Sequence, residues 1–201
     1  SRTGFSFTRF AIPRLAGYRG KALYLDADML LPDGFLARWF AEIERGGFDA
    51  AFGGFDAEPP ASPGERVHAA IARASDTGGA ETRARRGATA FCTSNLLVRA
   101  AVMPDLPFDE TFRGWGWEDV DWAVRAAQAG TLRHADNPAG HRGWQPVERL
   151  LARYREASAN YARLLAKHPE LARLPGAKAA RALRALPGQA ALRGVWQGLA
   201  R

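Results

Sequence analysis

Short apolar runs alternate with stretches of helical periodicity along residues 1–145, and this alternation constrains the fold more than any other feature. The run 21–25 (Lys-Ala-Leu-Tyr-Leu) is typical of a buried parallel strand. We expect further strands at 50–55, 89–98 and 132–134, and helices starting at Asp33 and near 66 and 118. The first of these helices would be capped by Asp33 and carry Phe35, Trp39, Phe40 and Ile43 on one face. Strands that alternate with helices predict an α/β domain.

The C-terminal part differs in pattern and in charge. From Pro146 onward, apolar residues recur at helical spacing as far as His168-Pro169, and shorter helices follow, broken at Pro187-Gly188. Residues 142–201 hold 12 of the 28 Lys and Arg but only 3 of the 21 Asp and Glu. We therefore expect an α/β domain at 1–145 and a basic helical extension at 146–201. A solvated face and peripheral contact with an anionic membrane through 142–201 are both open for the extension.

Several classes of protein are excluded or disfavoured by composition. One cysteine, Cys92, excludes an internal disulfide framework and a metal site built from thiolates alone, and we expect a small residue in a strand there. No nucleic-acid-binding motif is present, so no nucleic-acid partner is expected. The chain shows no secretory signal pattern and no apolar run long enough for a bilayer. We expect a cytoplasmic protein, and the alternative is a peripheral position at the inner face of the membrane.

The first group of candidate functional residues follows the 21–25 strand. Asp26 and Asp28 stand where that strand ends, and ligands of open α/β sheets bind at the carboxyl ends of strands. Two carboxylates one residue apart can share a divalent cation, and their hard oxygen atoms favour Mg²⁺ or Mn²⁺ over Zn²⁺. A turn or helix-capping role is the alternative for this pair.

The second group is the segment Gly114-Trp115-Gly116-Trp117-Glu118-Asp119 at a predicted helix start. Aromatic faces stack on the apolar C–H faces of sugars, and glycines let a loop move over a ligand. A carboxylate at this position can act as a general base toward a hydroxyl group. The alternative is an aromatic core corner in which the acids only supply negative charge to the helix N-terminus.

Together these segments resemble the GT-A glycosyltransferases. The stretch YLDADMLLP (24–32) looks like their strand and metal motif, and FDETFRGWGWEDVDWAVRAAQAG (108–130) is similar to the acceptor and catalytic segment of family 2 enzymes and to the C-terminal segment of β-1,4-galactosyltransferases. The upstream stretch 8–29 looks more like family 8. The resemblance implies a Rossmann-like α/β fold with a mixed, mostly parallel sheet.

The resemblance also implies roles for individual residues. Asp28 and His141 would be metal ligands for Mn²⁺ or Mg²⁺, and Asp26 would complete the metal site or contact the donor sugar or ribose. Asp119 would be the catalytic base, and Glu118 an acid that orients the acceptor. The remaining implied contacts are Arg9 near the donor diphosphate, and Trp115, Gly116 and Trp117 at the acceptor.

The implied activity is transfer of a sugar from a nucleotide-sugar donor, such as a UDP-sugar, to a carbohydrate or lipid-linked hydroxyl acceptor, with inversion. Only 25 residues precede Asp26, whereas the family places a nucleotide-binding half before this motif, so we expect the sequence to be incomplete at its N-terminus. Two alternatives stay open. One is a retaining family 8-like transferase, and the other is a truncated, non-catalytic module that binds a sugar or a partner.

Overall fold

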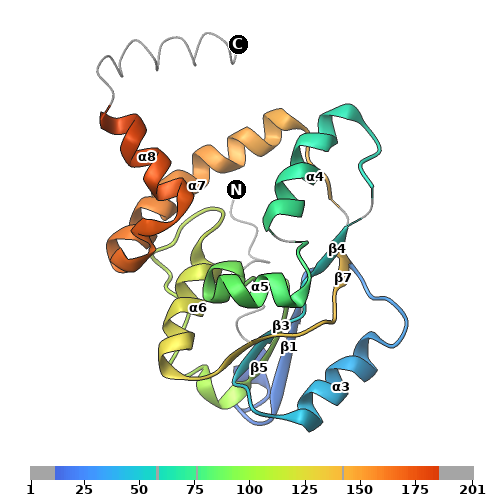
Figure 1. Cartoon of the computed structure of the whole chain (residues 1–201). Coiled ribbons are helices and arrows are strands. Elements are labelled where there is room, and N and C mark those ends of the chain that lie inside the picture. The colour runs from blue at the N-terminus through green and yellow to red at the C-terminus, as the bar shows by residue number, and fades with distance from the viewer. Residues whose placement is uncertain (1–11, 58, 76, 142, 186–201) are drawn as a thin grey trace. The chain divides into compact units, whose positions relative to one another are not determined.

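The computed structural model describes residues 12–57, 59–75, 77–141 and 143–185 (Figure 1). The chain divides into two compact units, one reaching to Asn160 and the other beginning at Tyr161. The first unit therefore includes residues 146–160, which we assigned to the C-terminal extension on sequence. Arg9, part of the basic tail and the helix expected after Pro187-Gly188 lie outside the described residues.

The first unit is an α/β structure with two mixed sheets. A four-stranded sheet has the order β1-β5-β3-β6, and its strands are β1 (Lys21–Leu25), β5 (Asn95–Arg99), β3 (Ala50–Phe52) and β6 (Leu132–His134). A three-stranded sheet has the order β2-β7-β4, from β2 (Met29–Leu30), β7 (Ala139–His141) and β4 (Phe55–Ala57). The α/β class expected from the sequence is thus confirmed.

The direction of the strands differs from the prediction. β1 and β3 both pair antiparallel with β5, and the β3–β6 pair is the one parallel pairing described in the four-stranded sheet. The expectation of a mostly parallel sheet was therefore wrong. Its basis was the run of apolar residues at 21–25, whose side chains pack against the core clusters on both faces of the sheet. Such packing does not depend on strand direction, and β1 is an edge strand that pairs antiparallel with β5.

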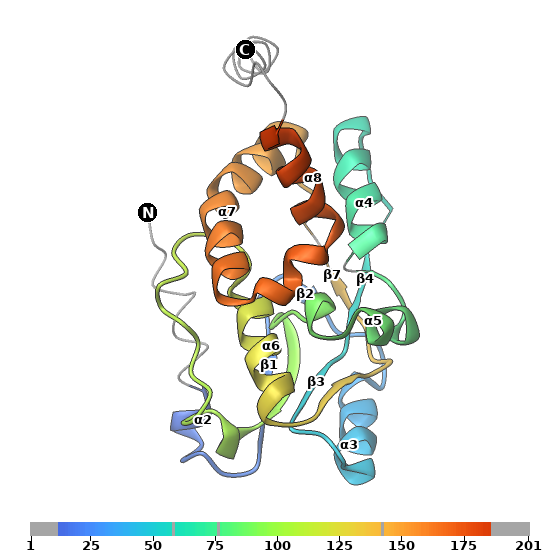
Figure 2. The same cartoon turned by 60° about the vertical axis from the view of Figure 1, so that its left-hand side comes forward.

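Both faces of the four-stranded sheet are covered by helices. One core cluster joins Ala22 and Tyr24 of β1 to Trp122 of α6 (Glu118–Ala129). The other joins Ala51 of β3 to Trp39 of α3 (Phe35–Arg45). Figure 2 shows α6 and α3 on either side of the strands. The alternation along each strand places successive side chains on opposite faces, so the sheet is the middle layer of three.

The first unit also contains the helix α4 (Pro63–Ser75) and several short helical elements. The short elements are α2 (Ile12–Leu15), α5 (Ala80–Arg86) and the 3₁₀ segments Gly87–Ala90 and Ala100–Val102. α7 (Val147–Lys167) begins in the first unit, and the second unit continues with a 3₁₀ turn (Pro169–Arg173) and α8 (Pro175–Ala185). None of the helices within the described part of the chain is both long and apolar enough to cross a bilayer.

Three local predictions need correction. The residue before α3 is Gly34, in a left-handed conformation with φ of 73°, so Asp33 is not the cap. Phe40, expected on the buried face of α3, is 63% exposed. The strand expected at 89–98 begins only at Asn95, because residues 87–90 form a 3₁₀ helix and residues 93–94 a turn, and Cys92 lies between these two and not in a strand.

The strand expected at 50–55 is interrupted by Gly53-Gly54, which separates β3 from β4. A Cβ atom on Gly53 would lie 2.8 Å from the Trp39 ring, so only glycine fits between these elements. Gly54 has a φ of 87°, which favours glycine and turns the chain into the second sheet.

Candidate functional site

The Asp-x-Asp motif lies where β1 ends and β5 begins. Leu25 is opposite Asn95 in the β1–β5 ladder, and the backbone N–H of Asp26 donates to Ser94 O at 3.2 Å. The backbone of Asp26 is therefore attached to the turn Cys92–Ser94. This turn is the reference point for the rest of the site.

Asp28 is brought to His141 by the small sheet. β2 pairs antiparallel with β7 so that Met29 is opposite His141, and His141 Nε2 lies 3.6 Å from Asp28 Oδ2. Neighbouring ligands of an octahedral divalent ion at about 2.1 Å lie about 3 Å apart, so this pair fits a shared ion after a small adjustment. A carboxylate oxygen and an imidazole nitrogen are both accepted metal ligands.

Asp26 does not form a described three-ligand cluster with this pair. Among the residues that the structure describes, no three His, Cys, Asp or Glu side chains gather into a group that would hold a metal ion. A Cβ atom placed on Gly143 would touch Asp28, His141 and Gln145, so these three side chains border one backbone position. The polar surroundings of the Asp28–His141 pair thus extend to the Gln145 amide.

Asp119 belongs to the same end of the four-stranded sheet. Thr93 Oγ1 donates to Asp119 Oδ1 at 2.7 Å, and Thr93 N donates to Asp119 Oδ2 at 3.3 Å. Cys92 Sγ also lies 3.3 Å from Asp119 Oδ2. The turn Cys92–Ser94 therefore contacts one acid of each candidate group, Asp26 through its backbone and Asp119 through its carboxylate.

The segment that leads into α6 is held in an unusual backbone conformation. Gly114 and Gly116 have φ values of 82° and 91°, and Trp117, directly before Glu118, has a φ of 76°. A bulky residue at positive φ costs about 1–3 kcal/mol and is typical of sites where the surroundings fix the backbone for function. Glu118, the expected acceptor-orienting acid, opens α6 and is half-buried.

The fixed surroundings are supplied by α7. Asn160 donates from Nδ2 to the carbonyl groups of Arg113 and Gly116, each at 3.0 Å. Trp115, which is 41% exposed, packs edge-to-face against Tyr154 with ring centroids 6.0 Å apart. The Arg153 guanidinium lies 5.6 Å from the centroid of the Trp115 ring. Residues 113–117, which we call the glycine loop, are thus attached to α7 at several points.

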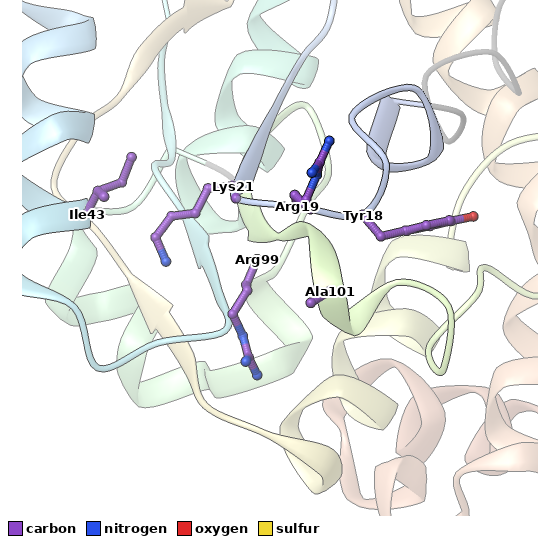
Figure 3. A pocket seen from close by; sticks show the side chains of 7 residues that line it. Tyr18, Arg19, Lys21, Ile43, Arg99 and Ala101 are labelled. Atoms are coloured by element: carbon purple, nitrogen blue, oxygen red, sulfur yellow. The ribbon is translucent and has the colours of Figure 1, made fainter.

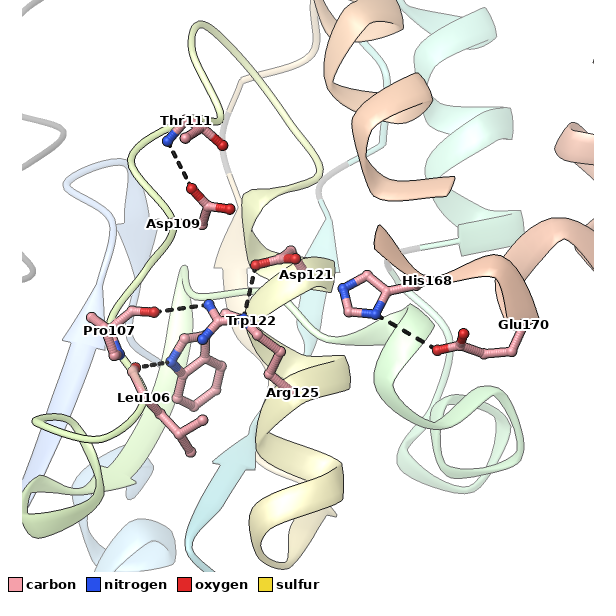
Figure 4. A network of polar contacts seen from close by, with 9 residues as sticks. All are labelled: Leu106, Pro107, Asp109, Thr111, Asp121, Trp122, Arg125, His168 and Glu170. Atoms are coloured by element: carbon pink, nitrogen blue, oxygen red, sulfur yellow. Dashed lines mark hydrogen bonds and ion pairs between the residues drawn. The ribbon is translucent and has the colours of Figure 1, made fainter. Parts of the chain in front are cut away.

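Asp119 and Asp121 form a second Asp-x-Asp pair in the sequence, and their surroundings differ. Asp121 is fully buried and accepts from Arg125 Nε at 3.0 Å, and Arg125 also donates to Pro107 O (Figure 4). Trp122 Nε1 donates to Leu106 O at 2.9 Å, and its ring stacks on Phe108. Asp121 therefore anchors the 106–108 segment to α6 through Arg125, while Asp119 in the same first turn of α6 reaches the site.

Arg83 ties together the strand ends beside this site. Its guanidinium is buried and donates to Phe52 O and Gly53 O at 3.1 Å and to Ala135 O at 2.9 Å. Burial lowers the pKa of Arg83, and the charge of Asp136 opposes that shift. A cation held by carbonyl groups fixes the carboxyl ends of β3 and β6 relative to each other.

A cavity of about 640 Å³ lies at the other end of β1 (Figure 3). Arg19, Lys21 and Arg99 line it, and the figure shows these side chains pointing in different directions. Arg99 pairs with Asp49, whose pKa is lowered mainly by the Thr131 N–H and further by Arg99. Because the cations diverge, the cavity has no convergent set of ligand-binding groups.

Comparison of the chain with protein-family models, curated proteins and solved structures finds no match.

Sequence reasoning missed three residues of this region: Thr93, Asn160 and Arg83. Asn160 carries a recognisable signal, because it continues the buried stripe of α7 that contains Leu150 and Ala157. A polar side chain that is buried on such a stripe needs a hydrogen-bond partner in another segment. Thr93 gives no local signal, since its partner Asp119 is 26 residues away.

Proposed function

We propose that the chain is a metal-dependent glycosyltransferase that moves a sugar from a nucleotide-sugar donor to a hydroxyl acceptor. The observation that carries this proposal is that one acid from each candidate group attaches to the same turn. Asp26 and Asp119 both attach to the turn Cys92–Ser94, and Asp28 lies beside His141. One group of acids can therefore serve the donor diphosphate while another serves the acceptor hydroxyl.

Asp28 and His141 are the residues that would hold Mn²⁺ or Mg²⁺. When bound, the ion would neutralise the charge that develops on the diphosphate leaving group. Asp26, two residues before Asp28, would accept hydrogen bonds from donor hydroxyl groups. The aromatic surface of Trp115 and Tyr154 would contact the apolar face of the acceptor sugar.

Asp119 would remove the proton from the acceptor hydroxyl as that oxygen attacks the anomeric carbon. The bond from that carbon to the diphosphate oxygen breaks on the opposite side, which inverts the anomeric configuration, and the proton stays on the carboxylate. Glu118, one residue before, would orient the acceptor. A retaining reaction remains the enzymatic rival, and NMR analysis of the anomeric product separates the two.

The test is release of UDP from a panel of UDP-sugars with Mn²⁺, run with acceptor sugars. We expect Asp28→Ala to abolish metal-dependent release. We expect Asp119→Asn to lower turnover by ~10²–10⁴-fold, because the general base is lost, while donor binding persists. The exposed acids Asp33 and Asp105 supply matched controls, Asp33→Ala and Asp105→Asn, which should retain turnover. Near-wild-type turnover of Asp119→Asn would remove this residue from the role of base.

A sugar-binding module without catalysis is the second candidate. The exposed aromatic pair Trp115 and Tyr154 favours it, since such a pair binds sugars without any metal or acid. In that case calorimetry would show sugar binding that is lost in Trp115→Ala and unchanged in Asp28→Ala. UDP release would then be the same with and without Mn²⁺.

A further inference from the structure

The turn Cys92–Ser94 holds Asp119 by both carboxylate oxygens. Oδ1 receives the hydroxyl of Thr93 at 2.7 Å, and Oδ2 receives the Thr93 N–H at 3.3 Å with the Cys92 sulfur also at 3.3 Å. A carboxylate with donors on both oxygens cannot rotate about its χ2 angle without breaking one of these bonds. The plane of the Asp119 carboxylate is thereby fixed mainly by Thr93, which contacts both of its oxygens.

Thr93 is itself held firmly. Its side chain is 1% exposed, so its hydroxyl group has little opportunity to exchange Asp119 for water. The following residue, Ser94, accepts the backbone N–H of Asp26, and Asn95 begins the central strand β5. The contacts of Thr93 consequently fix the Asp119 carboxylate relative to the sheet and to the Asp26 backbone, in addition to the position that α6 gives it.

One hydroxyl on Oδ1 leaves acceptor capacity on that oxygen, because each carboxylate oxygen offers two lone-pair directions. An acceptor hydroxyl could therefore donate to Asp119 while Thr93 remains bonded. A general base needs this arrangement, since it must be within hydrogen-bond reach of the proton it removes and must keep its orientation as it does so.

We infer that Thr93 is the positioning residue that orients Asp119 toward the acceptor hydroxyl. This inference rests on the proposed function, and it assigns a role to a residue that makes its contact across 26 positions of sequence. Loss of the hydroxyl removes the donor on Oδ1 and leaves the carboxylate held at Oδ2 alone, so its orientation is less well fixed. The effect should therefore fall on the chemical step and not on donor binding.

The kinetic test compares Thr93→Val with Thr93→Ser. Valine keeps the shape and the backbone N–H but removes the hydroxyl, and we expect kcat to fall ~10–100-fold with the donor KM within about twofold, as for a misplaced catalytic group. Serine restores the hydroxyl and should recover kcat to within about threefold. Thr77→Val is the matched control, because the Thr77 hydroxyl bonds to Ala72 O, in the helix α4. It should leave kcat unchanged.

A second readout does not depend on turnover. Cys92 is the single cysteine of the chain, so iodoacetamide modifies one defined thiol. The negative carboxylate 3.3 Å from its sulfur opposes formation of the reactive thiolate, so alkylation should be several-fold faster in Asp119→Asn. In Thr93→Val the rate of Cys92 alkylation should also differ from that of the wild type, whereas in Thr93→Ser it should equal the wild-type rate.

Each pattern of results decides the question. Equal loss of kcat in both Thr93 variants, or a loss in Thr77→Val of the same size, would mean a structural role and overturn the inference. Wild-type kcat in Thr93→Val would overturn it as well, while the proposed function stands through Asp28→Ala. If the wild-type chain has no transferase activity, the proposed function and the role of Thr93 fail together, and the alkylation rates then report only whether the contact exists.

Discussion

Replacing Arg83 with methionine should destabilise the first unit substantially. The change removes four hydrogen bonds from a charged donor, to Gly78 O at 2.8 Å and to the carbonyl groups of Phe52, Gly53 and Ala135. Bonds that involve a charged group contribute about 1.5–3 kcal/mol each, so the gross loss is large. Methionine is chosen because it fills most of the buried volume without any charge.

Two effects reduce that gross loss. Methionine avoids the cost of burying a guanidinium, which is several kcal/mol. Phe52 O and Gly53 O also keep backbone partners, the N–H groups of Ala135 at 2.9 Å and Asn137 at 3.3 Å, since a carbonyl oxygen accepts two bonds. The carbonyl groups that lose a bond without such a described replacement are then Gly78 O, in a half-buried residue, and Ala135 O, in a buried one. We expect a net loss of about 3 kcal/mol in the free energy of unfolding, as for a broken buried polar network.

Urea denaturation measures this loss directly, and for a chain of this size it corresponds to a fall of about 6–12 °C in Tm. Arg85→Met is the matched control on the same helix, because Arg85 is exposed and pairs only with the exposed Glu81 and Thr82 side chains among its described contacts. It should change stability by less than about 1 kcal/mol. If Arg83→Met unfolds within about 1 kcal/mol of the wild type, burial of the cation cancels its bonds, and the account of Arg83 as a stabilising clamp is refuted.

Two further predictions concern the glycine loop and pH. Gly114→Ala should lower stability by about 2 kcal/mol, because its φ is 82° and the new Cβ would meet Glu156. Gly64→Ala in α4, which has open space, should be neutral or stabilising, and equal denaturation midpoints for both variants would contradict this reasoning. Burial lowers the pKa of His134 below its ordinary 6.5, so the unfolded chain binds its proton first as pH falls. Stability should therefore be complete above about pH 6.5 and fall below it, by at most about 1.4 kcal/mol per pH unit. His134→Phe should flatten this part of the pH profile in urea titrations at pH 7 and pH 5, and an unchanged slope would refute the assignment.

The sequence predicted the elements whose signal is local. β1, β6 and α6 lie where expected, and α7 ends before His168-Pro169, because apolar periodicity and the helix-ending residues are encoded within each segment. The gathering of acids at strand ends was also expected from the position of Asp26 and Asp28 after a strand. The α/β class follows from the same local patterns.

The features that depend on distant partners could not be predicted. The antiparallel direction of β1 is set by pairing with β5, and nothing within 21–25 encodes that direction. The two-residue strand β2 exists through its pairing with β7, which is what brings Asp28 to His141. The contact of Thr93 with Asp119 has the same origin, so the residues expected to act could be named from sequence while those that hold them in place could not.

The order β1-β5-β3-β6 also determines when the sheet can form during synthesis. β1 pairs with a strand roughly 75 residues later, and β3 pairs with β6 roughly 80 residues later. At about 5–20 residues per second, a ribosome needs roughly 4–15 s to deliver the partner of β1. Contacts this far apart in the chain also close slowly. The apolar strand β1 must therefore remain unpaired for seconds, and this interval is when chaperones would act on the emerging chain.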